Sequence, residues 1–270
     1  MSRSSFLTTY GPWALVTGAS DGIGAEIAQD AARRGLNVVL VARRNDRLIT
    51  LAEQLSRAFD INVHVVVADL GMPEGIQTVL DQTVDLEIGL LANCAGFGTS
   101  GRFVATALET DLNMIDVNCR AVAALTHPIA RAMVERGRGG IVLMSSIVAF
   151  QGVAYSANYA ATKAYVQTFA EGLRAELEQS GVDVLASAPG PVASGFAERA
   201  DMRMGNAARP DVVARATLDA LGRTGTVHPG GLAKLLGYNL ALLPRWGRSA
   251  IMRQIMRGMT RHQDAEARPS

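Results

Sequence analysis

Several residue types are scarce in this sequence, and each scarcity excludes a class of protein. The 270 residues include two cysteines, Cys94 and Cys119, which are too few for a disulfide framework and lack the spacing of metal ligands. No apolar run reaches the roughly 18 residues that a membrane-spanning helix needs, and residues 1–10 lack the apolar core of a signal peptide. Basic and acidic residues nearly balance, 26 against 25, so no basic excess indicates a nucleic-acid partner. We therefore expect a cytoplasmic protein that binds neither metal nor nucleic acid.

The sequence does contain a long alternation of apolar runs and helical patterns. With 49% hydrophobic residues and no Pro-rich or Ser-rich linker, the chain is expected to form one domain over residues 1–270. Runs rich in Val, Ile and Leu predict strands at residues 13–17, 37–41, 62–67, 88–93, 140–145 and 182–188. Amphipathic patterns predict helices ending near Arg34 and at residues 46–58, 74–84, 108–136 and 155–179. Strands without polar alternation are buried on both faces, which predicts a parallel sheet covered by helices.

A glycine-rich turn lies between the first predicted strand and the first predicted helix. Gly18 permits a tight turn, Gly22 lets the backbone approach a ligand, and Gly24 lets the helix pack closely on the strand. The free N–H groups and the positive end of the helix dipole then suit a pyrophosphate. The spacing differs from Gly-x-Gly-x-x-Gly, but the strand before the turn and the helix after it predict a dinucleotide site, with an ordinary strand-to-helix turn as the alternative.

Tyr159 and Lys163 are one helical turn apart, thirteen residues after Ser146. Positions i and i+4 share a helix face, so we expect the ammonium to lie beside the phenol and to lower the pKa of Tyr159. A phenol that exchanges a proton, with a serine hydroxyl to hold an oxygen, suits carbonyl and alcohol chemistry. The alternative is a pair of solvated residues on a helix surface.

Together these motifs resemble the short-chain dehydrogenase/reductase family. The resemblance covers about the first three quarters of the chain, and its motifs are residues 17–24, Asp69-Leu70, residues 93–96, Asn118, Ser146, Tyr159 with Lys163, and residues 189–192. It implies a Rossmann-like, doubly wound three-layer sandwich, with a central parallel sheet of about seven strands and helices on both faces. Cys94 departs from the pattern, because relatives commonly carry Asn there.

The resemblance also implies a role for each matching residue. Tyr159 would be the general acid or base, Ser146 would hold the substrate oxygen, and Lys163 would lower the pKa of Tyr159 and bind the nicotinamide ribose. Asn118 would bend its helix and hold a water on the proton path. The expected cofactor contacts are Gly18, Ser20, Asp21, Gly22, Ile23, Gly24, Arg43, Arg44, Asp69, Leu70, Asn93, Ala95, Gly96, Tyr159, Lys163, Pro189, Gly190, Val192 and Ser194. A helix N-cap is the alternative for Asp69, and a plain turn is the alternative for residues 189–192.

The end of the second predicted strand favours NADP(H) over NAD(H). Ala42 fills the place where relatives that use NAD carry Asp, so a carboxylate for the ribose 2′-hydroxyl is missing. Arg43 instead offers a guanidinium suited to a 2′-phosphate, with Ser20 and Arg44 as further donors. For Arg44, a solvated charge at a helix start is the alternative.

The last quarter of the chain gives weaker signals. Residues 195–209 lie where the family has its substrate lid, and Met202 and Met204 would suit an apolar substrate. Residues 231–270 form a basic amphipathic extension, and no acidic residue occurs from Ala220 to Gln263. This extension packs on its own core or on a neighbouring subunit, or it contacts an anionic membrane or an acidic acyl carrier.

The sequence therefore predicts an NADPH-dependent carbonyl reductase, reversible toward alcohol oxidation. Its expected substrate is an apolar ketone or secondary alcohol, such as a 3-oxoacyl thioester, a steroid-like ketone or another hydrophobic carbonyl. The alternatives are an NADP-binding regulatory or scaffold protein with vestigial turnover, and a membrane-associated lipid reductase. The resemblance also implies a homodimer or homotetramer that pairs the helices near residues 108–136 and 155–179.

Overall fold

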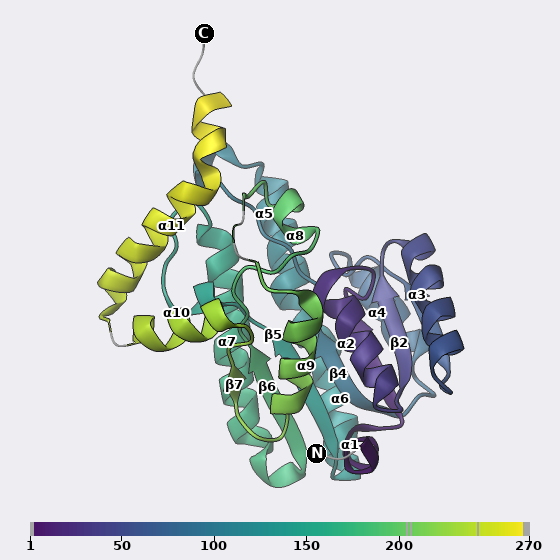
Figure 1. The fold of residues 1–270 in the computed structure, drawn as a ribbon. Coiled ribbons are helices and arrows are strands. Elements are labelled where there is room, and N and C mark those ends of the chain that lie inside the picture. Colours follow the sequence, from purple (N-terminus) through teal and green to yellow (C-terminus); the bar gives the residue numbers. More distant parts are fainter. Residues whose placement is uncertain (1–2, 204, 206, 242, 267–270) are drawn as a thin grey trace.

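A parallel sheet runs through the protein, whose computed structural model describes residues 3–203, 205, 207–241 and 243–266 (Figure 1). Within these residues the sheet has seven strands in the order β3-β2-β1-β4-β5-β6-β7. The strands are β1 (Trp13–Thr17), β2 (Asn37–Ala42), β3 (Val63–Val67), β4 (Ile88–Asn93), β5 (Gly139–Met144), β6 (Val182–Ser187) and β7 (Thr226–Val227). The order reverses between β1 and β4, which is where ligands bind in open α/β sheets.

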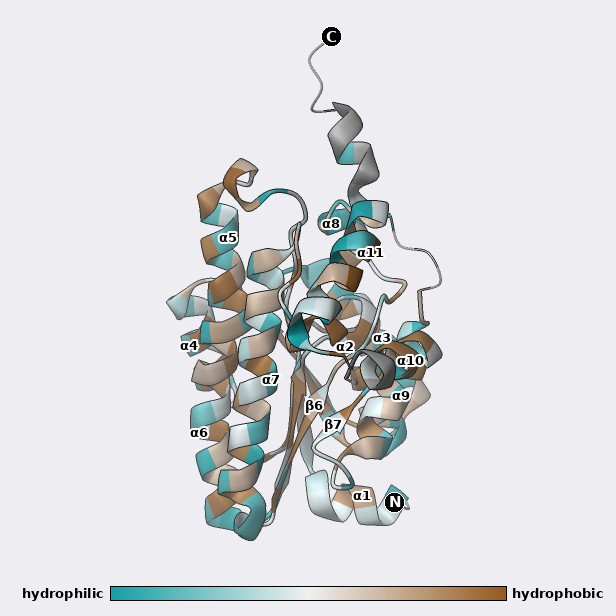
Figure 2. Cartoon of the chain, turned by 90° about the vertical axis from the view of Figure 1, so that its left-hand side faces the viewer, coloured by the Kyte–Doolittle hydropathy of each residue, from teal (hydrophilic) through white to brown (hydrophobic). Residues whose placement is uncertain are grey.

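Helices cover both faces of the sheet, as Figure 2 shows. One layer contains α1 (Arg3–Tyr10), α2 (Gly22–Arg33), α3 (Asn45–Ala58) and α9 (Pro210–Ala220). The other contains α4 (Pro73–Gln82), α5 (Leu108–Ile115), α6 (Ala121–Arg136) and α7 (Ala157–Leu177). Short 3₁₀ turns occur at Phe103–Ala105, Ile147–Phe150 and Glu178–Ser180. The predicted three-layer fold is confirmed.

Two apolar cores lie between the three layers. Ala14 and Val16 of β1 belong to one core, whereas Leu15 between them belongs to the other. Because successive strand residues point to opposite faces, a continuous apolar run supplies both cores at once. The lack of polar alternation in the sequence follows directly from this arrangement.

The helix predicted over residues 108–136 contains a break in its hydrogen-bond pattern. A π-helical turn at Asp116–Arg120 separates α5 from α6. One extra residue in the turn shifts the side chains that follow, and such turns are frequent at functional sites. Asn118 lies in this turn and is buried.

Two elements have little signal in the sequence. Helix α1 is held by Phe6 and Tyr10, which are buried one turn apart, and the Tyr10 hydroxyl donates to Asp183 Oδ2 at 2.7 Å. Strand β7 has two residues, which is too short for any periodicity to be visible.

The C-terminal helices form a hairpin at one side of the sheet (Figure 1). After the short α8 (Phe196–Arg199) and α9, the chain continues into α10 (Gly231–Ala241) and α11 (Arg245–Glu266). Met252 and Met256 of α11 are buried with Val153 and Ala160 of the same chain. In the predicted lid Met204 and residue 206 lie outside the described residues, as do residues 242 and 267–270 of the extension. Nowhere in the described part of the chain is a helix long and apolar enough to cross a membrane.

Candidate active site

A cavity of about 1030 Å³ opens at the carboxyl ends of the strands. The segments that follow β1 to β6 all reach it, at Gly18, Arg43, Asp69, Cys94, Ser145 and Pro189 respectively. Residues of α10 and α11 also line the cavity, and we call the part that they form its far end. Parallel strands place their carboxyl ends at one edge of the sheet, so segments distant in sequence converge there.

The glycine turn forms one wall of the cavity. Gly18 and Gly22 have φ of +68° and +54°, values that glycine adopts without strain. A β-carbon on Gly18 would lie 2.9 Å from Ala95 Cα, so the turn also needs a residue without a side chain. Asp21 precedes α2 and makes no side-chain capping bond to it. The first turn of α2 therefore keeps backbone N–H groups for an anionic ligand, which fits a dinucleotide phosphate.

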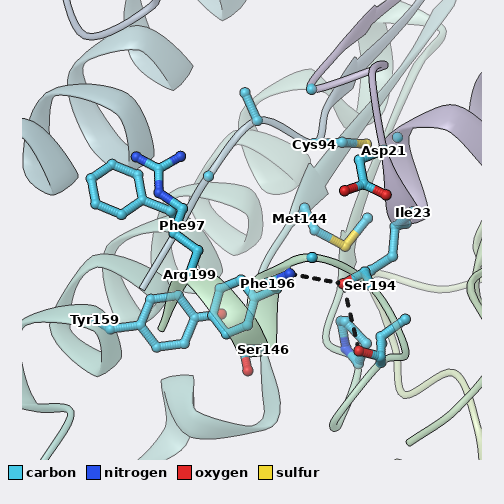
Figure 3. Close-up of a pocket in the computed structure, with 18 of the residues that line it drawn as sticks. Asp21, Ile23, Cys94, Phe97, Met144, Ser146, Tyr159, Ser194, Phe196 and Arg199 are labelled. Atoms are coloured by element: carbon cyan, nitrogen blue, oxygen red, sulfur yellow. Dashed lines mark hydrogen bonds between the residues drawn. The ribbon is translucent and has the colours of Figure 1, made fainter. Parts of the chain in front are cut away.

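Ser146, Tyr159 and Lys163 all line the same cavity. Tyr159 and Lys163 come from α7, and Ser146 follows β5. Figure 3 shows Ser146 and Tyr159 near Phe196, whose ring centroid is 5.3 Å from that of Tyr159. Lys163 Nζ lies 5.7 Å from the centre of the Tyr159 ring and donates to the Met144 carbonyl at 2.7 Å. The structure thus brings the three predicted groups together.

Burial shifts the pKa values of Tyr159 and Lys163. It raises the pKa of the Tyr159 phenol well above its ordinary value, and a hydrogen bond with Ser146 opposes that rise. Burial also lowers the pKa of Lys163 to about 8. The expectation that Lys163 lowers the pKa of Tyr159 is wrong for this structure. The loss of solvent outweighs other effects on the phenol, and the ammonium is directed to the Met144 carbonyl.

Asn118 lies behind the cavity wall. Its amide donates to the Phe97 carbonyl at 2.9 Å and to Thr162 Oγ1 at 3.0 Å, and its oxygen accepts from the Phe97 N–H at 3.1 Å. Gly96 and Phe97 themselves line the cavity. Asn118 therefore fixes the segment after β4 against α7 from the π-helical turn.

Charged side chains gather where β2 and β3 end. Arg43 Nη1 lies 3.5 Å from Asp69 Oδ2, and Arg44 Nη2 donates to Ser20 Oγ at 3.0 Å. Arg44 and Arg47 both approach Asp21, at 3.5 and 3.4 Å. Ala42 ends β2 and lines the cavity without adding a carboxylate. We call this part of the cavity, lined by Arg43, Arg44 and Arg47, its mouth. The mouth is cationic, and its two acids, Asp21 and Asp69, already lie against these arginines.

Most of the predicted cofactor contacts line the cavity, but Asn93 does not. Asn93 Nδ2 donates to Thr126 Oγ1 of α6 at 3.0 Å, which points the side chain into the layer of helices. The Asn93 side chain therefore does not reach the cavity, and a cofactor contact at this residue stays a prediction. The residues that do line the cavity are Gly18, Ser20, Asp21, Gly22, Ile23, Gly24, Arg43, Arg44, Asp69, Leu70, Ala95, Gly96, Tyr159, Lys163, Pro189, Gly190, Val192 and Ser194.

Asp69 binds locally as well as to Arg43. Its Oδ1 accepts from the Gly71 N–H at 3.0 Å, which closes a turn before α4. The residue at the N-cap of α4 is Met72, so the alternative interpretation of Asp69 as a cap does not hold.

Sequence reasoning missed several cavity residues. Arg199 stacks on Phe97, with its guanidinium carbon 3.8 Å from the ring centroid, and Arg47 reaches the mouth from α3. Single arginines on helices look like surface charges in a sequence, so no pattern identified Arg199 or Arg47. The far end is lined by Leu232, Leu236, Met252, Ile255, Met256 and Met259. Helical periodicity identified this apolar face, but its destination depends on tertiary packing.

Known proteins resemble the chain in sequence and structure. A family profile described as short chain dehydrogenase matches residues 12–204. The 17-beta-hydroxysteroid dehydrogenase type 3 of Mus musculus is 35% identical over 189 residues, which are 69% of this chain and 62% of that protein. The inactive hydroxysteroid dehydrogenase-like protein 1 of Homo sapiens is 32% identical over 196 residues, 72% of this chain and 59% of that protein. The chain thus spans less than two thirds of the length of these curated relatives.

A solved structure adds to this likeness. A short-chain dehydrogenase from Sphingobium yanoikuyae in complex with NADPH is 33% identical to the chain and superposes with a TM-score of 0.77. The match covers 86% of this chain and 93% of that one.

Proposed function

Because the chain belongs to the short-chain dehydrogenase/reductase family of nicotinamide-dependent oxidoreductases acting on CH–OH and C=O groups, we propose that it is an NADPH-dependent carbonyl reductase. The reaction is reversible toward alcohol oxidation, and the substrate is an apolar ketone or secondary alcohol. One observation carries the proposal: a single cavity joins the glycine turn, the Ser146, Tyr159 and Lys163 trio, and an apolar end made by α10 and α11.

The residues of the trio take separate parts in the reduction. A bound reduced nicotinamide supplies the hydride that the carbonyl carbon receives. Tyr159 gives its proton to the carbonyl oxygen, and the Ser146 hydroxyl donates a hydrogen bond to the same oxygen as charge develops there. A phenol whose pKa is raised stays protonated at neutral pH, which suits the acid in a reduction. Lys163, with its pKa lowered to about 8, can return a proton to the phenolate.

The cationic mouth supports a preference for NADP(H). Arg43 and Arg44 lie after β2 where an NAD enzyme needs a carboxylate, and Ser20 Oγ is already bound by Arg44. A 2′-phosphate would accept from both guanidinium groups and the hydroxyl, since phosphate matches their geometry. The NADPH complex of the Sphingobium yanoikuyae relative agrees with this choice.

The apolar end of the cavity supports a hydrophobic substrate. Thioether and aliphatic side chains of α11 line it, and methionines adapt to bulky shapes. The mouse relative is named for a hydroxysteroid, which is a substrate of this kind. Within the predicted lid of residues 195–209, the described residues 195–203 cover the bound substrate, with Phe196 beside Tyr159.

The test is NADPH consumption over a panel of apolar ketones. Tyr159→Phe should lower kcat by about 10²–10⁴-fold while the protein still binds NADPH, because the phenol proton is lost. Tyr165→Phe is the matched control, since Tyr165 is on the same helix but does not line the cavity. Equal turnover by wild type and Tyr159→Phe would refute the assigned mechanism.

A second candidate is an NADP-binding regulatory or scaffold protein with vestigial turnover. The relative from Homo sapiens that is named inactive favours it. Tight NADPH binding without oxidation by any ketone, in wild type and Tyr159→Phe alike, would support this second function over the first.

A further inference from the structure

The hairpin of α10 and α11 has two chemically different faces. Its inner face closes the apolar end of the cavity through residues such as Leu236, Met252 and Met256. Its outer face lies at the periphery of the molecule (Figures 1 and 2). The outer face is not explained by the proposed catalytic function.

The outer face combines an exposed tryptophan with arginines. Trp246 and Arg253 are seven residues apart, so they share one side of α11, and both are exposed. Arg257 follows on the same side, but its Nε donates to the Tyr155 hydroxyl at 3.4 Å. Trp246 is 78% exposed at the start of the helix, where α10 turns into α11. Met252 and Met256, about a quarter of a turn away around the helix, are buried. Exposed apolar residues that gather on one surface mark contact sites for proteins or membranes.

The hairpin carries further exposed apolar residues and further basic residues. Leu235 of α10 is 61% exposed, and Leu243 and Ile251 are also exposed. Between Ala220 and Gln263 the sequence has no aspartate or glutamate. Its basic residues there are Arg223, Lys234, Arg245, Arg248, Arg253, Arg257 and Arg261. Up to Gln263 the hairpin therefore combines exposed apolar residues with basic charges only, and Asp264 and Glu266 follow at the end of α11.

We propose that the outer face of the α10–α11 hairpin docks on an anionic lipid bilayer. Tryptophan and leucine enter the headgroup boundary, while arginines pair with lipid phosphates, which is how interfacial amphipathic helices bind. The helices lie on the bilayer rather than cross it, in keeping with their hydropathy. The inner face of the same hairpin then places the apolar end of the cavity next to the lipid, a consequence that rests on the proposed function.

Charge complementarity favours a bilayer over a second copy of the chain. A two-fold contact through this face would set the same cationic residues against each other. An anionic membrane neutralises them instead, and about one kcal/mol per Lys or Arg near the surface is typical of such contacts.

The experiment measures co-sedimentation of the full chain with vesicles. Wild type should bind mixed phosphatidylglycerol–phosphatidylcholine vesicles at least about tenfold more tightly than pure phosphatidylcholine, and high salt should weaken the binding. The combined variant Trp246→Ser, Arg245→Gln and Arg253→Gln should lose at least about tenfold in affinity for the anionic vesicles. None of these three residues lines the cavity, so ketone reduction without vesicles should be unchanged.

Controls separate docking from general charge and from misfolding. Arg57→Gln removes an exposed charge from α3, far from the hairpin in sequence, and should bind vesicles like wild type. The chain has two tryptophans, so a blue shift of emission on vesicles that disappears in Trp246→Phe assigns the contact to Trp246. Equal vesicle binding by the combined variant and wild type would overturn the proposal, as would the absence of vesicle binding.

Two other outcomes would reassign the face. Loss of an oligomer in the combined variant, without vesicle binding by wild type, would make it a contact between copies. Binding to an acidic acyl carrier protein but not to vesicles would make it a protein-docking surface. Because turnover of a water-dispersed ketone is measured separately, failure of docking and failure of the proposed function are distinguishable.

Discussion

At the scale of single residues, cofactor preference depends on the side chain that ends β2. Ala42 lines the cavity beside Arg43 and leaves room for a phosphate. Ala42→Asp would set a carboxylate against the 2′-phosphate of NADPH and offer an acceptor to the 2′-hydroxyl of NADH. We expect the ratio of kcat/KM for NADPH over NADH to fall by at least about tenfold, since like charges at a contact are strongly disfavoured.

The control for this prediction is Ala58→Asp at the exposed end of α3, which adds the same charge away from the mouth. Its cofactor preference should match that of wild type. An Ala42→Asp enzyme that keeps its preference for NADPH would show that Arg43 and Arg44 do not contact the ribose phosphate.

The burial of Tyr159 predicts the protonation state of its phenol. Burial raises its pKa in the folded protein, so the phenol should stay protonated at pH values where an ordinary tyrosine, with a pKa of about 10, is half ionised. The folded form holds the proton more tightly than the unfolded form. This group therefore lowers stability only as pH rises above about 10.

Ultraviolet difference titration of wild type against Tyr159→Phe measures this ionisation directly. The folded pair should show no phenolate difference up to about pH 10, whereas the same pair in denaturant should show one step near that value. A step below pH 9 to 10 in the folded pair would mean that Lys163, and not burial, controls the phenol.

Single residues differ in how much of their role the sequence reveals. The convergence of Ser146 and Tyr159 was predictable, because their motif places one after a strand and the other on the next helix. The pKa direction of Tyr159 was not predictable, because burial comes from distant segments. The direction of the Asn93 side chain was not predictable, because its strand-end position does not tell which face the side chain takes.

At the scale of elements, the π-helical turn at Asp116–Arg120 shapes the cavity wall. Asn118 in that turn satisfies both the N–H and the carbonyl of Phe97. Asn118→Ala would leave these buried groups unpaired, and we expect it to lower the free energy of unfolding by about 2–3 kcal/mol. Urea denaturation measures the change, and NADPH affinity should fall with it because Gly96 and Phe97 line the cavity.

The exposed Asn62→Ala provides the comparison, with an expected change within about 0.5 kcal/mol. A stability loss for Asn118→Ala no larger than that for Asn62→Ala would mean that the Phe97 contacts contribute little.

The sequence predicts those elements whose residue pattern is complete within a short stretch of the chain. The strands of the core show continuous apolar runs, and the glycine turn combines residue type with position. The π-helical turn escaped prediction because one inserted residue barely alters a helical period. Helix α1 carried a weak signal in the spacing of Phe6 and Tyr10, whereas β7 carried none because it has two residues.

At the scale of the whole molecule, the site is assembled from both ends of the chain. Gly18 follows the first strand, and Met259 lies in the last helix, yet both line one cavity. The parallel sheet explains why the strand ends meet, so the part of the site around the glycine turn and the strand ends follows from the fold. The apolar half depends on how the C-terminal hairpin packs, and a hydrophobic helix face alone does not specify its partner.

At the scale of the whole molecule we also expect the chain to self-associate through an exposed surface of α5. Leu108, Leu112 and Ile115 are exposed at intervals of four and three, which forms an apolar stripe along the helix. Contiguous exposed apolar residues mark interaction surfaces, and we expect this stripe to pair with another copy of the chain as a homodimer or homotetramer. Leu112→Glu would place a charge in that contact.

Light scattering coupled to gel filtration measures the assembly. Wild type should elute at a multiple of the protomer mass, and Leu112→Glu should weaken association by at least about tenfold, because a charge buried at an interface without a partner is costly. Ile49→Glu is the control, since Ile49 is comparably exposed on α3 in the other helical layer and should leave the mass unchanged. A wild type at the protomer mass, or a Leu112→Glu variant that assembles like wild type, would exclude the stripe as the contact between copies.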